Sequence, residues 1–256
     1  MTAPDTTPRK NTLGTIAAGA GFGIAFVSAV AAVLAGLGTR WGWWDFRTGF
    51  MILRCAVWAG LAAAAISLYA TFVAWRHGYR RAIVFGIHGL IIGALVFGVP
   101  SYLVNEGRKL PPIHDITTDT DDPPAFVAVL PLRKNAPNPA QYAGAELAAQ
   151  QKQGYPGLAP LVLPIPPRAA FDLALDIARR AGWEIVAAVP EDNRIEATAT
   201  TDWFGFKDDI VIRIKPAGTG SRVDMRSVSR VGRSDLGTNA RRIRDFLRQL
   251  SAGKAG

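Results

Sequence analysis

Arginine and serine are concentrated in one segment of the chain, RSVSRVGRSD at residues 226–235. The segment runs from a predicted strand, through a turn that contains Gly232, into the start of a predicted helix. Arginine offers paired donors to a phosphate or a carboxylate, and the N–H groups at the start of a helix also attract anions. The pattern therefore predicts a site for an anionic ligand. Its candidate residues are Arg226, Ser227, Ser229, Arg230, Arg233, Asp208 and Asp209.

A purely structural explanation of the same segment is also open. In that explanation Arg226 and Arg230 form ion pairs with aspartates of neighbouring strands, and a side chain of the turn caps the helix that follows. The aspartates would be Asp202, Asp208 or Asp209, and the cap would be Ser234 or Asp235.

Patterns for catalysis and metal binding are weak. After Val104 the chain has one histidine, His114, and no cysteine, so a Ser–His–Asp arrangement would need His114 to reach a distant serine. Asp208 and Asp209 are adjacent in a predicted strand, so they point to opposite faces and cannot share a proton. The acidic cluster at 114–122 lacks the glycine that turns a calcium-binding loop. The sequence therefore favours a protein that is not an enzyme, and it indicates no catalytic residue, metal or cofactor.

Three stretches of the C-terminal half resemble a known family. They are HDITTDTDDPPAF at 114–126, TDWFGFKDDIVIRI at 201–214 and RVDMRSVSRVGRSDLGTNARRI at 222–243. They are similar to the bacterial and plastid family known as the domain of unknown function 1499, and the similarity extends over residues 113–250. The resemblance implies a membrane-associated envelope protein. Since that family has no established biochemical activity, the resemblance says more about the fold than about the function.

The N-terminal part of the chain has the composition of a membrane protein. Apolar runs at 13–37, 55–75 and 82–103 are each long enough to cross a hydrocarbon core of ~30 Å as a helix. The first run exceeds the ~7–15 apolar residues of a cleaved signal peptide, which favours a retained anchor over that alternative. We therefore predict three transmembrane helices within residues 1–104. Two small-residue patterns, Gly19-x-x-x-Gly23 and Gly89-x-x-x-Gly93, would let helix backbones approach closely.

Positive charge is concentrated around these helices. Eight Lys/Arg and two Asp/Glu precede Asn105, whereas 21 Lys/Arg and 18 Asp/Glu follow from there. A nucleic-acid-binding protein would carry its excess of positive charge on the soluble part of the chain, so we expect no nucleic-acid partner. With the N-terminus inside, Arg9, Lys10 and the loop 76–81 lie in the cytoplasm, and the two sides carry equal numbers of Lys/Arg. The three arginines of this short loop decide the orientation, which places the C-terminal part on the periplasmic side of a bacterial inner membrane.

The C-terminal part has the pattern of a soluble α+β domain. Residues 105–124 read as an extended linker, whose net charge of −3 would let it dock on the C-terminal arginines. Residues 125–256 read as a two-layer domain with a four-stranded antiparallel sheet and two packing helices. The four strands are predicted at 183–189, 194–201, 209–215 and 222–230, the helices begin at Pro167 and near Leu236, and a further short strand is predicted at 125–130.

These features predict a membrane-tethered envelope protein of unknown activity. Its soluble domain would bind an anionic ligand, a lipid headgroup or an envelope protein partner, and the lipid bilayer is the partner that the helices themselves indicate. The alternative is a membrane-bound hydrolase or transferase that acts on an envelope substrate. In that case Arg226 and Arg230 would stabilise charge and an aspartate would act as the base.

The predicted topology is tested by reporter fusions to the C-terminus of the full chain. We expect a fused alkaline phosphatase to be active and a fused green fluorescent protein to be dark, because the C-terminal part lies outside the cytoplasm. The opposite pair of results, with an inactive phosphatase and bright fluorescence, would place the domain in the cytoplasm.

Overall fold

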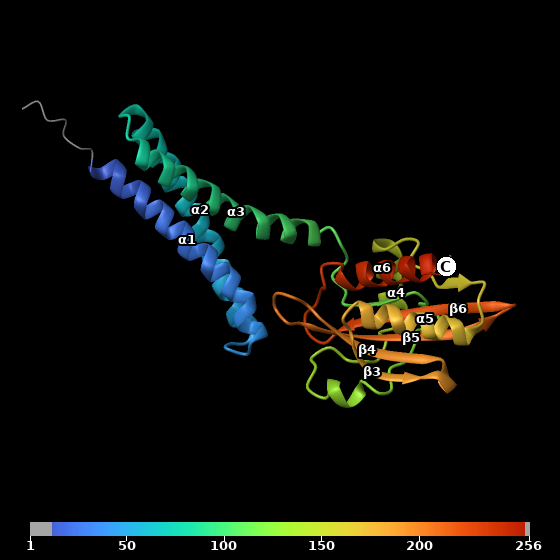
Figure 1. The fold of residues 1–256 in the computed structure, drawn as a ribbon. Coiled ribbons are helices and arrows are strands. Elements are labelled where there is room, and N and C mark those ends of the chain that lie inside the picture. Colours follow the sequence, from blue (N-terminus) through green and yellow to red (C-terminus); the bar gives the residue numbers. More distant parts are fainter. Residues whose placement is uncertain (1–11, 254–256) are drawn as a thin grey trace, which may run out of the picture. The chain divides into compact units, whose positions relative to one another are not determined.

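The computed structural model describes residues 12–253. Arg9 and Lys10, which entered the topology prediction, lie outside the described residues. The chain forms two compact units (Figure 1). The first is helical and runs to Leu103, together with Trp203–Gly205. The second is an α+β unit that comprises Val104–Asp202 and the residues from Phe206 onward.

The helical unit consists of three long helices. They are α1 (Thr12–Arg40), α2 (Phe46–Arg76) and α3 (Arg80–Gly107). Each is long and apolar enough to cross a membrane, which confirms that three such helices precede the domain. The second helix begins nine residues before its apolar run, because Asp45 caps it by accepting the N–H groups of Arg47 and Thr48.

Glycines let α2 and α3 approach closely. A methyl group at Gly89 would lie 2.4 Å from the hydroxyl oxygen of Ser67 on α2, and one at Gly93 would lie 2.5 Å from a backbone oxygen of the same helix. By contrast, methyl groups at Gly19 and Gly23 would meet nothing within 4 Å. Only the second small-residue pattern therefore lies at a helix contact within this unit.

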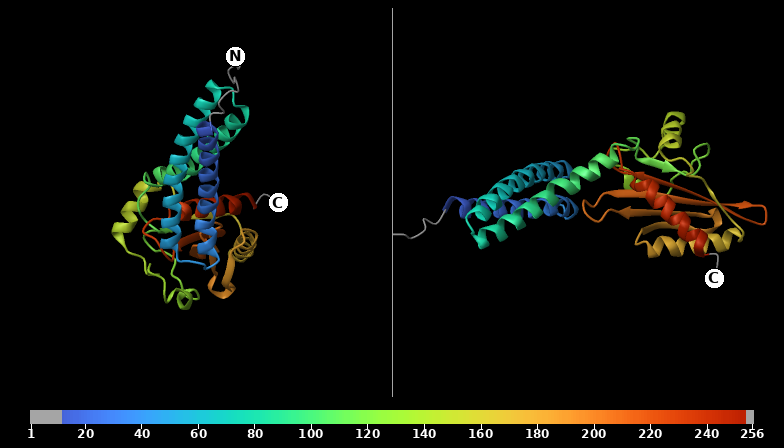
Figure 2. Two further views of the ribbon diagram at one scale, coloured as in Figure 1. Left: turned by 90° about the vertical axis from the view of Figure 1, so that its left-hand side faces the viewer. Right: turned by 90° about the horizontal axis from the view of Figure 1, so that it is seen from above.

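The α+β unit is built on a six-stranded antiparallel sheet (Figures 1 and 2). Its strands are β1 (Asp115–Thr117), β2 (Leu161–Leu163), β3 (Glu184–Val189), β4 (Arg194–Thr200), β5 (Lys207–Ala217) and β6 (Gly220–Ser229). The order is β1-β6-β5-β4-β3, and β2 also pairs with β6, next to β1 along the same edge.

The prediction of four strands was incomplete. All four are present as β3 to β6, but β1 and β2 add two short strands that cover the outer edge of β6. Each is three residues long, which is too short to show an alternation of its own. As a result, the segment read as a linker at 105–124 contributes a strand to the sheet. No strand forms at 125–130; the chain there enters a short 3₁₀ helix, η1 (Leu130–Arg133).

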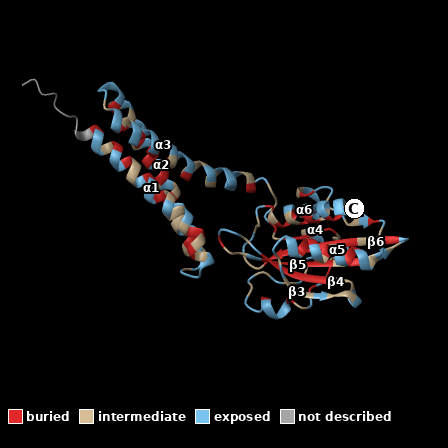
Figure 3. Ribbon diagram, viewed as in Figure 1, coloured by how far each residue is buried: buried red, intermediate tan, exposed pale blue. Residues whose placement is uncertain are grey.

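Two helices cover one face of the sheet. Alternate residues of β5, namely Ile210, Ile212 and Ile214, point to this face and are buried. They pack against α5 (Pro167–Arg180) and α6 (Thr238–Ala252), as predicted for a two-layer domain. Figure 3 shows the buried residues along β5 and β6 between these helices and the rest of the unit.

A third helix of this unit, α4 (Ala145–Gly154), is joined to the sheet by a buried glutamine. The side chain of Gln151 accepts the N–H of Thr117 at 2.9 Å and donates to its carbonyl oxygen at 2.6 Å. Gln151 thus pairs with β1 as a neighbouring strand would.

We expect Gln151→Ala to lower the free energy of unfolding by about 1–3 kcal/mol, because both backbone groups of Thr117 would lose their buried partner. Hydrogen exchange of the full chain should show faster exchange at Thr117. The exposed neighbour Gln153 provides the control, and equal behaviour of Gln151→Ala and Gln153→Ala would contradict this assignment.

Candidate functional site

The face of the sheet away from α5 and α6 is charged. Strand residues on this face include Glu196, Asp209, Asp224 and Arg226, which are each no more than 2 % exposed. They alternate with the isoleucines and other apolar residues that face the helices. Residues 119–143, which follow β1, supply the hydrogen bonds and apolar side chains that cover this face.

Arg226 lies at the centre of this cover. Its Nε and one terminal nitrogen donate to the two carboxylate oxygens of Asp115 at 2.9 and 2.7 Å. Two further donors reach the carbonyl oxygens of Pro124 and Ala140. The guanidinium also lies 5.2 Å from the ring centre of Phe126. Since four of its five N–H donors are used within the unit and the side chain is buried, Arg226 holds the fold together and is not offered to a ligand.

Asp209 is the centre of a second cluster of buried hydrogen bonds on this face of the sheet. It accepts hydrogen bonds from Arg133 at 2.6 Å, from Thr198 at 2.7 Å and from both sides of the Arg230 guanidinium at 2.8 and 2.9 Å. Burial by itself raises the pKa of Asp209, but the hydrogen bonds from Arg230, Thr198 and Arg133 outweigh burial and hold the pKa below its ordinary value.

Asp208 points the other way, as the sequence predicted for adjacent strand residues. Its carboxylate accepts from Arg242 of α6 at 2.6 Å. On the same side, Asn239 accepts from the hydroxyl of Ser227 and donates to the hydroxyl of Ser229. These three predicted site residues therefore join α6 to the sheet.

The turn before α6 contains two further residues that the sequence singled out, Asp235 and Arg233. The N-cap residue of α6 is Gly237, and the side chain of Asp235, two residues earlier, accepts the N–H groups of Gly237 and Asn239, as the structural explanation required. Burial raises the pKa of Asp235. Arg233 is the one predicted site residue that stays exposed, and within residues 12–253 it has no hydrogen-bond or ion-pair partner. It lines a shallow hollow of about 260 Å³ that also includes His114 and Glu146.

Glu196 is a charged residue that sequence reasoning missed. Its carboxylate accepts the three consecutive N–H groups of Val127, Ala128 and Val129, at 3.0 to 3.1 Å, and pairs with Arg194. The only sequence signal is an acid at a central position of a strand whose neighbours are apolar, and that signal does not identify the partner.

The acidic segment after β1 is also bound to arginines. Asp119 accepts from Arg222 at 2.6 Å, and Asp122 accepts from Lys215 at 2.8 Å. Burial alone raises the pKa of Asp119, but the N–H groups of Asp122 and Asp121, followed by the nearby arginines, lower it overall. The negative segment therefore lies against basic side chains of β5 and β6, as its charge suggested.

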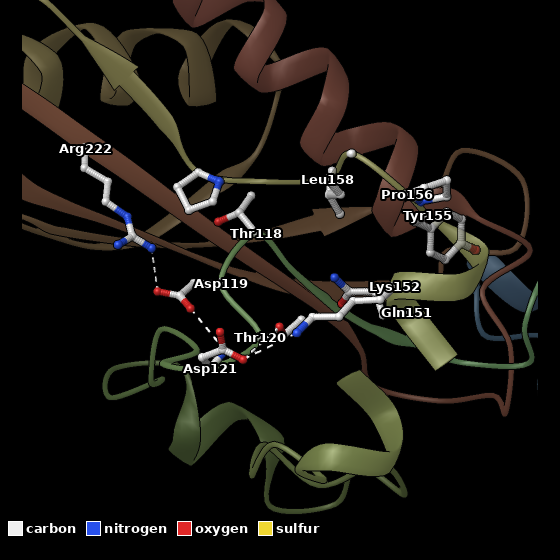
Figure 4. Close-up of a pocket in the computed structure, with 12 residues that line it drawn as sticks. Thr118, Asp119, Thr120, Asp121, Gln151, Lys152, Tyr155, Pro156, Leu158 and Arg222 are labelled. Carbon is white, nitrogen blue, oxygen red and sulfur yellow. Dashed lines mark hydrogen bonds and ion pairs between the residues drawn. The ribbon is translucent and has the colours of Figure 1, made fainter. Parts of the chain in front are cut away.

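A groove lies beside this segment (Figure 4). Its volume is about 490 Å³. The floor is made by buried residues, among them Thr118, Gln151 and Tyr155, and charged side chains lie along its edge. The full lining is Thr118, Asp119, Thr120, Asp121, Gln151, Lys152, Tyr155, Pro156, Gly157, Leu158, Pro160 and Arg222. Of these, Asp119 and Asp121 belong to the acidic cluster that the sequence singled out, and Arg222 belongs to its C-terminal arginines.

Tyr155 in this groove is unusual. It is 4 % exposed, and its hydroxyl has no hydrogen-bond partner in the part of the chain that the structure describes. Burial raises its pKa to about 12, so the hydroxyl is neutral at physiological pH. The edge of the groove is charged and exposed to solvent, whereas its floor is buried. At the edge, Lys152 lies 3.5 Å from Asp121, and both side chains are more than half exposed.

Comparison with known proteins identifies the sheet domain. A family model described as "Protein of unknown function (DUF1499)" matches residues 115–250, which is more than half of the chain. This confirms the resemblance seen in the sequence. The match begins at Asp115, the first residue of β1. A search of curated proteins gave no match.

The role of Asp209 gives a stability prediction. We expect Asp209→Asn to lower the free energy of unfolding by about 3–5 kcal/mol at pH 7, because Arg133 and Arg230 would lose their buried counter-charge. The folded-state pKa of Asp209 lies below its ordinary value. Its ionised form therefore stabilises the fold above about pH 4, and this contribution is lost as the pH falls through the folded-state pKa.

The difference between wild type and Asp209→Asn in urea unfolding should thus shrink from pH 7 to about pH 3. Asp172→Asn is the matched control, because Asp172 forms an exposed pair with Arg168 and should cost less than about 1 kcal/mol. Equal losses for the two variants at pH 7 would contradict a structural role for Asp209.

Proposed function

We propose that this chain, which belongs to the DUF1499 family of proteins of unknown function, is a membrane-anchored binding protein. In this proposal the three helices hold it in a bacterial inner membrane, and the α+β unit lies on the periplasmic side. The ligand is a small polar molecule or lipid headgroup that carries an anionic group together with hydroxyl or ammonium groups. It binds in the groove of Figure 4.

The observation that carries the proposal is the distribution of charge along this groove. Lys152 and Asp121 form a direct, exposed ion pair at 3.5 Å, and an exposed pair of this kind contributes at most about 1 kcal/mol. A ligand anion can therefore replace Asp121 beside Lys152 at little cost, and Asp121 is then left to receive a hydroxyl or ammonium group. Arg222 lines the same groove and is about one-third exposed.

The groove is also better suited to binding than the arginine segment that the sequence favoured. Arg226 and Arg230 are committed to Asp115 and Asp209, so a ligand would have to break buried ion pairs to reach them. Breaking such a pair costs about 3–5 kcal/mol. The exposed pair of Lys152 and Asp121 at the edge of the groove carries no such penalty.

The alternative function, a hydrolase or transferase, needs a group that exchanges a proton near neutral pH. The carboxyl of Asp119 in the groove has its pKa lowered by backbone N–H groups and arginines, which makes it a poor general acid and a weak base. The carboxyl whose pKa is raised, Asp235, is occupied in capping α6. These properties favour binding over catalysis.

A variant that fills the groove tests the proposal. The full chain in detergent is heated with soluble headgroup analogues such as glycerol 3-phosphate and phosphoethanolamine. A ligand at 100 times its Kd should stabilise the protein by about 2.7 kcal/mol, which corresponds to a rise in Tm of roughly 5–10 °C. Thr120→Trp places an indole in the groove and should abolish that rise.

The matched control is Thr219→Trp, which places the same side chain in the exposed β5–β6 turn and should leave the rise intact. The proposal fails if none of the analogues shifts the wild-type Tm. It also fails if the shift in Thr120→Trp is as large as in Thr219→Trp.

A further inference from the structure

Exposed apolar side chains of the α+β unit are concentrated in one short segment. After the end of α3, and apart from Trp203, the large apolar residues that are exposed are Val127, Leu130, Leu132, Val162 and Leu236. Three of these lie within six residues of each other. They are Val127, Leu130 and Leu132, with exposed fractions of 54 %, 46 % and 51 %. We call these three the apolar tip.

The apolar tip is held rigidly from beneath. Glu196 accepts the N–H groups of the first turn of this segment, and Arg133 donates to Asp209 at 2.6 Å. Phe126 and Val129 alternate with the tip residues and are buried against β5 and β6. The segment is thus fixed in one conformation, with its backbone hydrogen bonds satisfied on the inner side.

The orientation of this segment is the reverse of the usual one. Arg133 is 6 % exposed and Glu196 is completely buried, whereas the leucines on either side of Pro131 point outward. Charged residues of a soluble protein are rarely buried in this way, and clustered exposed apolar residues indicate a contact surface.

Arg133, which directly follows the apolar tip, is bonded to the sheet beside β1, the first strand after the membrane helices. Arg133, next to Leu132, donates to the carbonyl oxygen of Val228, and Val228 pairs with Asp115 at the start of β1. Only residues 108–114 separate the end of α3 from β1. Seven residues span at most about 25 Å, so the start of β1 stays within about that distance of the end of α3.

We propose that the apolar tip inserts into the surface of the bilayer in which the chain is anchored, with exposed Lys134 beside it at the level of the lipid phosphates. This is a second interaction of the α+β unit, separate from ligand binding in the groove. It holds the unit in a fixed pose against the membrane.

The size of the apolar tip favours lipid over a protein partner. A stable protein interface uses about 20–30 residues on each side, and three apolar side chains fall far short of that. A tethered domain needs far less contact area, because the membrane helices already hold it at a high effective concentration beside the lipid. The positive charge of Lys134 is complementary to anionic headgroups.

Site-specific fluorescence tests this inference on the full chain in liposomes. Cys55, the one cysteine, is replaced by serine, and Leu130→Cys or Val162→Cys is labelled with the polarity-sensitive fluorophore NBD. Val162 is the matched control, because it is an equally apolar residue of the same unit and is 62 % exposed. The liposomes contain phosphatidylglycerol and phosphatidylcholine, with or without lipids that carry a quencher near the headgroup.

We expect the label at Leu130→Cys to show a blue-shifted emission and strong quenching by the modified lipids, and the label at Val162→Cys to show neither. Adding Lys134→Glu should weaken the quenching at position 130. Equal quenching at the two positions would overturn the inference. So would a blue shift at position 130 that lipid quenchers leave unchanged and that grows with protein density, since the tip would then contact a second copy of the chain.

Discussion

The face of the sheet away from α5 and α6 carries four carboxylates that are almost completely buried: Asp115, Glu196, Asp209 and Asp224. A carboxylate removed from water is tolerated only when cations or N–H groups replace its hydration. The sheet supplies part of that replacement through Arg226 and Arg230, and residues 119–143 supply the rest. This segment brings Arg133 to Asp209, three N–H groups to Glu196 and carbonyl oxygens to Arg226. It is therefore an integral layer of the domain, although it has almost no regular secondary structure.

The functional consequences follow from this layer. Because Arg226 and Arg230 neutralise buried acids, we propose that the ligand site lies in the groove at the edge of the layer, where the Lys152–Asp121 pair is exposed. The same layer turns the side chains of Val127, Leu130 and Leu132 outward, while the side chain of Arg133 turns inward. The apolar tip is thus an outer surface of this layer, and Asp119, Thr120 and Asp121 of the same layer form one side of the groove.

The sequence predicted those elements whose signal is local. The three apolar runs, the alternating isoleucines of β5 and the opposite directions of Asp208 and Asp209 each follow from residues next to one another. Partners far apart in the chain could not be predicted. Arg226 binds Asp115, 111 residues away, where the sequence offered the nearer Asp208 and Asp209. The strands β1 and β2 are likewise recognisable only once β6 is beside them, and Gln151 acts as a strand partner without any strand pattern.

The most direct test of a structural role for the charged layer is amide hydrogen exchange of the unmodified full chain at pH 7. The N–H groups of Val127, Ala128 and Val129 are bonded to Glu196 and should exchange as slowly as those in the centre of β5 and β6, through global unfolding of the domain. Exchange of these three amides at the rate of an exposed loop, while β5 and β6 stay protected, would show that the segment is an ordinary surface loop and would contradict this account.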